Sequence, residues 1–113
     1  MEPRLATSLL VTALVRRAEA EGGFAAVLAK GDAMAGSMLV VLTEKGAKTA
    51  VYERALRPDG CYEWVAASVQ ATEKEAEVPE FIARRRRFDP DLWVLELDIP
   101  SIERFAAGMN AFG

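Results

Sequence analysis

The apolar positions near the start of the 113-residue chain recur at helical spacing. Over residues 5–21, side chains such as Leu10 and Leu14 lie three or four positions apart, which predicts a helix with an apolar stripe along one side. Gly22 and Gly23 follow, so we expect the helix to end there. A helix of this kind is expected to pack against a sheet.

Four short runs of apolar and β-branched residues follow and predict strands. The segment 31–37 is interpreted as a hairpin loop, and residues 57–60, Arg-Pro-Asp-Gly, are typical of a tight turn. Because short loops join the four runs, an antiparallel meander is the simplest topology. The predicted strands span residues 24–30, 38–43, 48–56 and 61–69.

The segment that ends in the arginine run 84–87 predicts a second helix. Thr72 and Glu75 form a capping-box pattern at its start, and basic residues at its end suit the helix dipole. Pro79 removes an amide donor within this segment. The helix is therefore either kinked at this proline or regular only from about Glu77.

The residues after the arginine run predict a turn and a buried strand. Residues 88–91, Phe-Asp-Pro-Asp, turn the chain, and the strand 92–98 is apolar on both faces, which places it inside the sheet. Ser101 is positioned to cap a short last helix over residues 102–109. The predicted fold class is α+β: an antiparallel sheet of about five strands with an N-terminal helix, a second helix before the last strand and a short C-terminal helix.

Length and composition predict a single domain over residues 1–113. With 51% hydrophobic and 27% charged residues, the chain has the composition of a globular protein rather than a disordered one. No apolar run of about eighteen residues occurs, so we expect no membrane-spanning helix. Thr7, Ser8 and the pair Arg16-Arg17 make the N-terminus unlike a signal peptide, which favours a cytoplasmic protein.

The chain has no histidine and one cysteine, Cys61. This composition excludes an intrachain disulfide and the usual structural zinc sites, and it removes the commonest general base. A lone thiol fits a reducing compartment. Since no histidine can activate it, we interpret Cys61 as a strand residue in or near the core. No cofactor is expected.

The arginine run is the main candidate binding site. Guanidinium groups pair well with carboxylates and phosphates, although a helical run displays only two of four arginines to one ligand. The alternative interpretation is a solvated helix end that complements the helix dipole. The predicted contact surface consists of Arg84, Arg86, Arg87, Asp89, Asp91 and Trp93.

The expected ligand of this surface is a protein partner or a second copy of the chain, and we expect a homodimer. Fourteen basic and seventeen acidic residues leave a formal charge of -3. Nucleic acid is therefore a weaker candidate, because binders of nucleic acid are commonly basic overall. The first functional hypothesis is a non-enzymatic binding or interaction module.

A magnesium site built from carboxylates is the alternative, because it needs no histidine. It would support a metal-assisted phosphotransfer or nuclease-like enzyme that uses Asp32, Asp89 and Asp91, with Glu96 and Asp98 as further oxygen ligands. Aspartates that flank a proline commonly accept bonds from backbone amides instead. Structural use of these carboxylates is therefore favoured, and no residue is assigned as catalytic or as a metal ligand.

Several stretches together carry a resemblance to a known family. They are the helix end 14–19, Gly22-Gly23-Phe24, the loop 30–36 (Lys-Gly-Asp-Ala-Met-Ala-Gly), and the arginine run that continues into Phe-Asp-Pro-Asp-Leu-Trp-Val over residues 88–94. The chain resembles, from about Arg4 to Asp98, a family of short bacterial proteins catalogued only as a domain of unknown function. The resemblance implies a small cytoplasmic α+β protein and implies no mechanism.

Overall fold

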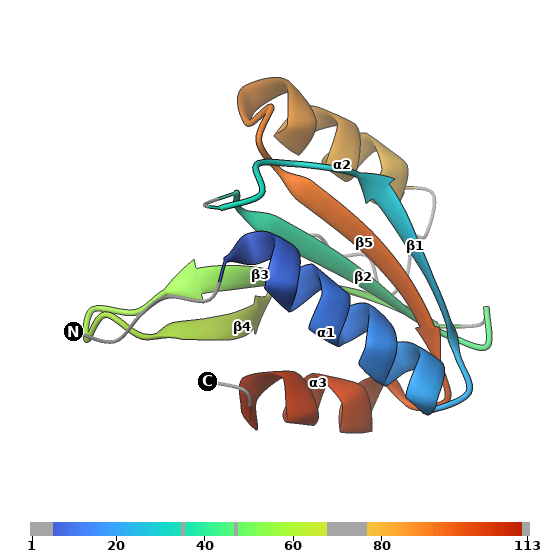
Figure 1. Cartoon of the computed structure of the whole chain (residues 1–113). Coiled ribbons are helices and arrows are strands. Elements are labelled where there is room, and N and C mark those ends of the chain that lie inside the picture. Colours follow the sequence, from blue (N-terminus) through green and yellow to red (C-terminus); the bar gives the residue numbers. More distant parts are fainter. Residues whose placement is uncertain (1–5, 35, 47, 68–76, 112–113) are drawn as a thin grey trace.

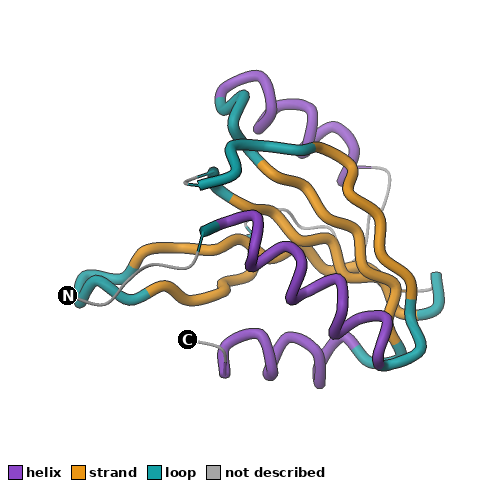
Figure 2. The backbone as a smooth tube through the Cα atoms, viewed as in Figure 1, coloured by secondary structure: helices purple, strands orange, loops and turns teal. Residues whose placement is uncertain are grey.

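The computed structural model describes residues 6–34, 36–46, 48–67 and 77–111. In this described part the chain forms helices on both sides of a twisted sheet (Figure 1; Figure 2). In chain order the elements are α1 (Thr7–Ala20), β1 (Phe24–Ala29), β2 (Met38–Glu44), β3 (Lys48–Leu56), β4 (Tyr62–Ala66), α2 (Glu77–Phe88), β5 (Trp93–Ile99) and α3 (Ile102–Ala111).

The strands lie in the order β1-β5-β2-β3-β4. β5 is inserted between β1 and β2, as the prediction of an interior strand required, and it runs antiparallel to β1 but parallel to β2. The remaining pairs, β2 with β3 and β3 with β4, are antiparallel. The α+β fold class is therefore confirmed, with one parallel pair in a mostly antiparallel sheet.

The predicted antiparallel meander is confirmed for β2, β3 and β4, but its first step, the hairpin loop at 31–37, is wrong. This loop joins β1 to β2, which are not neighbours, because β5 lies between them. The physical reason lies in β5, whose burial pattern shows buried residues on both faces, such as Val94 and Leu95. A strand of this kind is stable only where neighbouring strands and helices cover it on all sides. The pattern of apolar residues within residues 24–43 cannot show that a strand from later in the chain lies between these two strands.

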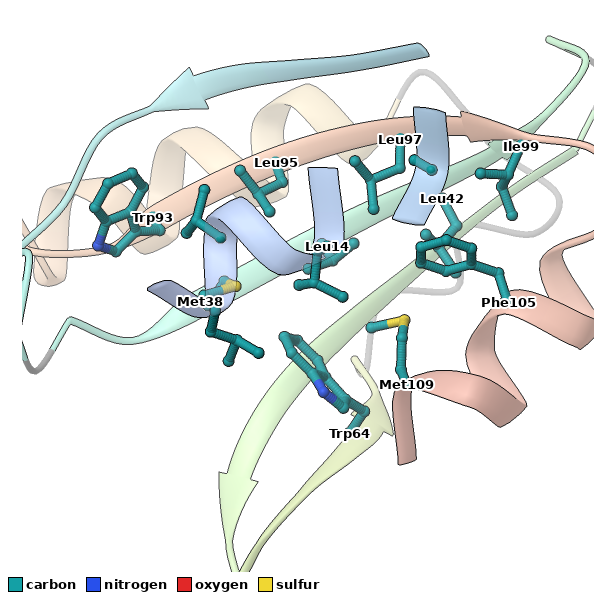
Figure 3. Packing of buried hydrophobic residues seen from close by; sticks show 14 residues of the cluster. Leu14, Met38, Leu42, Trp64, Trp93, Leu95, Leu97, Ile99, Phe105 and Met109 are labelled. Carbon is teal, nitrogen blue, oxygen red and sulfur yellow. The ribbon is translucent and has the colours of Figure 1, made fainter. Parts of the chain in front are cut away.

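α1 and α3 cover one face of the sheet (Figure 1). Leu14 from α1 and Phe105 and Met109 from α3 are fully buried against side chains of β2 and β5, and Trp64 reaches the same core from β4 (Figure 3). The apolar stripe of α1 consists of Leu10, Val11, Leu14 and Ala18, which confirms the predicted amphipathic helix.

Arg17 joins the two helices of this face. Its guanidinium carbon lies 4.3 Å from the centre of the Phe105 ring, and its Nη2 donates to the carbonyl of Arg104 at 3.4 Å. The N-terminus of α3 is held in turn by Ser101, whose hydroxyl accepts from the amide of Arg104 at 3.2 Å, as predicted for a capping serine. The Glu44 carboxylate accepts from the Ile102 amide at 3.0 Å.

α2 covers the opposite face, where it buries a smaller cluster (Figure 1). Val78 is buried, and Phe81 and Ile82 are packed against Leu39, Val94 and their neighbours. In the described residues the helix spans Glu77–Phe88, with Pro79 in its first turn. The predicted capping box of Thr72 and Glu75 lies outside the described residues.

The predicted ends of most elements agree with the structure to within two residues. The exception is the strand predicted for residues 61–69, because β4 ends at Ala66 and residues 68 and 69 lie outside the described part. Cys61 precedes β4 in the turn and is exposed, so its predicted place in or near the core is wrong. In the described ranges, no helix has the length and apolar character needed to cross a membrane.

Candidate functional site

The end of α2 presents three arginines to solvent. Val78, Phe81 and Ile82 face the sheet, so helical spacing directs Arg87 away from it and Arg84 and Arg86 to the two flanks of the helix, and all three are exposed. None of the three forms an ion pair with another residue in the described part of the chain. We call Arg84, Arg86, Arg87, Asp89 and Asp91 the basic corner.

Arg85, by contrast, is held against the sheet. Its Nη2 lies 2.7 Å from Oε2 of Glu53 on β3, and its guanidinium carbon lies 5.9 Å from the centre of the Phe81 ring. Both members of the ion pair are about one-third exposed. Arg85 therefore anchors α2 to the sheet and is the arginine of the run least available to a partner.

Trp93 does not belong to the contact surface, and its inclusion in the predicted site is wrong. It is only 4% exposed and lies in the core with α1, where Figure 3 shows its indole beside Met38 and Leu95. Its Nε1 donates to the carbonyl of Asp32 at 2.7 Å. Because β5 is interior, the alternating side chains of this strand enter one of the two helix-covered faces. Trp93 therefore holds the loop at 31–37 in place and does not offer a contact to a partner.

Two segments far apart in sequence meet beside the basic corner. The Asp32 amide donates to the Asp91 carbonyl at 3.1 Å, and the Trp93 amide donates to the Ser37 carbonyl at 2.8 Å. Gly31 and Gly36 pass so close that an added Cβ on either would collide with the Asp91 carbonyl oxygen. The loop of the family resemblance thus packs directly on the turn that contains its most specific residues.

α1 fixes the other side of this loop. Thr7 is the buried polar residue of the first helical turn, and its hydroxyl donates to the carbonyl of Gly36 at 3.1 Å. The Ser8 amide donates to the carbonyl of Ala33 at 2.9 Å. These contacts were not predicted from the sequence. The glycines at both ends of the loop are the available signal, because close approach of two backbones requires residues without a side chain.

The aspartates of the alternative hypothesis, a magnesium site, accept hydrogen bonds from nearby backbone amides. Asp32 Oδ2 accepts from the Met34 amide and Asp89 Oδ1 accepts from the Asp91 amide, each at 3.1 Å. Such bonds are the usual role of aspartate in turns. Glu96 and Asp98 lie further along β5, where Asp98 Oδ1 accepts from the Lys45 amide at 3.0 Å.

A metal site of the predicted kind does not form in the described ranges. No three or more Asp, Glu, Cys or His side chains gather there in a group that could hold a metal ion. The alternative hypothesis considered five carboxylates as possible magnesium ligands for their oxygen chemistry alone: Asp32, Asp89, Asp91, Glu96 and Asp98. The structure separates them between a turn, a loop and the far end of a strand.

An open hollow of about 470 Å³ lies on the α2 face at the other end of the strands. Its floor contains Glu96 and Asp98, and its walls include Phe24 from β1 and Val78 and Pro79 from the first turn of α2. It exists because α2 covers only part of this face. The basic corner and the hollow are therefore separate regions, at opposite ends of α2.

The fold and the corner define a small α+β protein with a basic surface at one helix end. The sequence profile of the family described as "Protein of unknown function (DUF1491)" matches residues 5–107. The chain belongs to this family. The family resemblance inferred from the sequence is thereby confirmed.

Solved structures of similar proteins share this fold. A DUF1491 family protein from Caulobacter crescentus CB15, solved by crystallography, is 37% identical over 90% of this chain and 94% of that chain, with a TM-score of 0.81. Its NMR structure gives 36% identity, coverage of 93% and 94%, and a TM-score of 0.81. Protein Atu0922 from A. tumefaciens is 32% identical, with coverage of 92% and 93% and a TM-score of 0.71. Among proteins with curated descriptions, none matches the chain.

Proposed function

We propose that the protein is a cytoplasmic, non-enzymatic binding module whose basic corner holds an acidic surface of another protein. The observation that carries this proposal is the exposure of Arg84, Arg86 and Arg87 on one helix end, without an ion pair to any described residue. Guanidinium groups bind carboxylates in fixed, often bidentate geometry, which gives such a surface specificity.

An apolar side chain accompanies these charges. Phe88 is 83% exposed at the last position of α2, directly after the arginine run. Aromatic and arginine side chains together are the groups that dominate the energetics of protein interfaces. A protein with both an acidic patch and an apolar cleft fits this surface better than a purely polyanionic ligand.

The charge distribution favours a different protein over nucleic acid or a second copy at this corner. The net charge of -3 disfavours a long polyanion. In a symmetric contact between two copies, the three arginines of one corner would meet the two carboxylates, Asp89 and Asp91, of the other, which is a poorer charge match than an acidic surface of a different protein. Asp89 and Asp91 at the border of the corner add selectivity, since they repel acidic groups that bind out of register.

The test is a pulldown from lysate with Arg84→Gln, Arg86→Gln and Arg87→Gln combined. We expect the variant to fold, because all three side chains are exposed, and to lose the partner that the unmodified chain retains. The control combines Arg16→Gln and Arg104→Gln, two exposed arginines on α1 and α3, and it should retain the partner. Identical partners for all three proteins would refute the proposal.

Two further measurements separate this function from its competitors. Binding of a single-stranded oligonucleotide that persists at physiological salt and is lost in the triple variant would assign the corner to nucleic acid. A rise in Tm with magnesium or manganese would support a metal-assisted enzyme, since a ligand that binds the folded state stabilises it. We expect neither result.

A further inference from the structure

The strand β1 forms one edge of the sheet and lacks the charged residues and proline that commonly protect an edge. It pairs with β5 on one side and is the terminal strand in the described sheet. Its sequence, Phe-Ala-Ala-Val-Leu-Ala, contains no charged residue and no proline. Edge strands of soluble proteins usually carry such residues, because an exposed row of amide and carbonyl groups is a template for another strand.

The side chains of β1 are also unusually apolar for their exposure. Phe24 is 75%, Val27 49% and Leu28 48% exposed, and they make up three of the seven large hydrophobic side chains exposed in the described part. In the register with β5, Phe24 lies opposite Asp98 on the α2 face, and Val27 lies opposite Leu95 on the α1 face. Apolar surface therefore flanks this edge on both faces, where an added strand would cover it.

The opposite edge of the sheet, strand β4, is more polar than β1. β4 carries Glu63, and its Tyr62 ring is covered by the guanidinium of Arg54, 4.0 Å from the ring centre. Trp64 of the same strand is buried in the core. Charged side chains are a common protection of an edge strand. Of the two edges, β1 is thus the one suited to accept a strand.

We infer that β1 pairs antiparallel with β1 of a second copy, which gives a two-fold symmetric dimer with one sheet running through both chains. A neutral strand pairs with its own copy without like-charge repulsion, although each chain carries a charge of -3. Antiparallel pairing of identical strands is self-complementary about a two-fold axis. The outer edges of the dimer are then two β4 strands, so assembly stops at two chains.

The apolar run sets the register. Ala26 lies in the middle of residues 24–28, so the axis is placed at Ala26, with Ala25 opposite Val27 across it. A register shift in the β1–β5 pair between Val27 and Ala29 places an irregularity at Leu28, the last residue of this overlap, so the regular part of the pairing is shorter than the apolar run. The paired segment is short, so we expect the dimer to dissociate on dilution. This contact surface is distinct from the basic corner and does not depend on the proposed function.

Sedimentation equilibrium over a range of concentrations tests the inference. The unmodified chain should show a monomer–dimer equilibrium, and Val27→Lys, which sets a charge beside the axis in both copies, should be monomeric. The control Leu56→Lys introduces the same charge at an exposed apolar residue at the end of β3, and this variant should dimerise like the unmodified chain. The triple arginine variant of the corner should also remain dimeric. A monomer at every concentration, or a dimer unaffected by Val27→Lys, would overturn the inference.

Cross-linking gives a second test that adds no charge to the edge and so remains decisive if Val27→Lys fails to fold. Ala26→Cys in a Cys61→Ser background should form a disulfide-linked dimer on mild oxidation, because the two thiols lie opposite each other at the axis. Leu56→Cys in the same background is the matched control and should stay monomeric under these conditions. Equal cross-linking of the two variants would contradict pairing through β1.

Discussion

On one face of the sheet, α1 and α3 enclose a core that contains both tryptophans, Phe105 and Met109. On the other face, α2 is the helix of the described part, and the buried cluster has seven mostly smaller residues, one of them Val78 of α2 itself. The first face is closed by two helices joined through Arg17 and the Phe105 ring. The second leaves Glu96 and Asp98 in an open hollow and holds its helix partly through the ion pair of Arg85 with Glu53, which is about one-third exposed. The two faces therefore differ in how much apolar area each removes from water.

This difference separates the stabilising part of the molecule from the part available for binding. Free energy of folding scales with buried apolar area, so the α1/α3 face is expected to dominate stability. α2 is less deeply packed and leaves Arg84, Arg86 and Arg87 exposed. Substitutions on this helix can therefore change recognition while the fold survives.

The largest expected effect is that of Phe105→Ala. This side chain is fully buried between α3, α1 and the sheet, so its removal should lower the free energy of unfolding by about 3–5 kcal/mol. Phe81→Ala on α2 removes the same ring from a partly buried site and should cost about 1–2 kcal/mol. Urea denaturation followed by tryptophan fluorescence measures both values. Equal losses would show that the two faces stabilise the protein equally.

An intermediate effect is expected at the junction where the loop and the corner meet. Gly31→Ala places a Cβ against the Asp91 carbonyl oxygen, so backbone must shift, at a cost of about 1–3 kcal/mol. The Trp93 indole N–H should report the shift in an NMR spectrum, because it donates to the neighbouring Asp32 carbonyl. Gly46→Ala is the control: its positive φ of 73° makes alanine unfavourable there as well, but its Cβ meets no atom of the junction, so that signal should stay unchanged. An unmoved indole signal in Gly31→Ala would mean that the junction tolerates the methyl group.

The smallest effect should come from Arg85→Gln. It breaks the ion pair to Glu53, and because both side chains are about one-third exposed, solvent screening limits the loss to less than about 1 kcal/mol. Denaturation at low and high salt gives the measurement, and the difference from the unmodified chain should shrink as salt rises. A loss as large as that of Phe105→Ala would mean that α2 depends on this pair rather than on its apolar contacts.

Much of the fold could be predicted because its signals are local. The stripe of Leu10 and Leu14 predicted α1, and the arginine run correctly marked the end of α2. Apolar residues on both faces of β5 predicted its interior position. The strand order was wrong because no local pattern shows that β5 separates β1 from β2.

The candidate site was predicted less completely. Helical spacing suffices to place Arg84, Arg86 and Arg87 outside, since the apolar side of α2 must face the sheet. Sequence position alone assigned Trp93 to the same surface, yet its side chain enters the core. The contact of Asp32 with Asp91 joins backbone groups, and a backbone contact leaves no pattern in side-chain polarity.

By itself, the sequence of this protein determined which segments are helices and strands and which side chains share one side of each element, because these properties follow from spacing along the chain. Only the tertiary structure decided that β5 runs parallel to β2, that Trp93 anchors a loop, and that the apolar strand β1 is left at an edge. These features depend on which distant segments meet. Their contacts form between residues whose separation along the chain has no periodic signature.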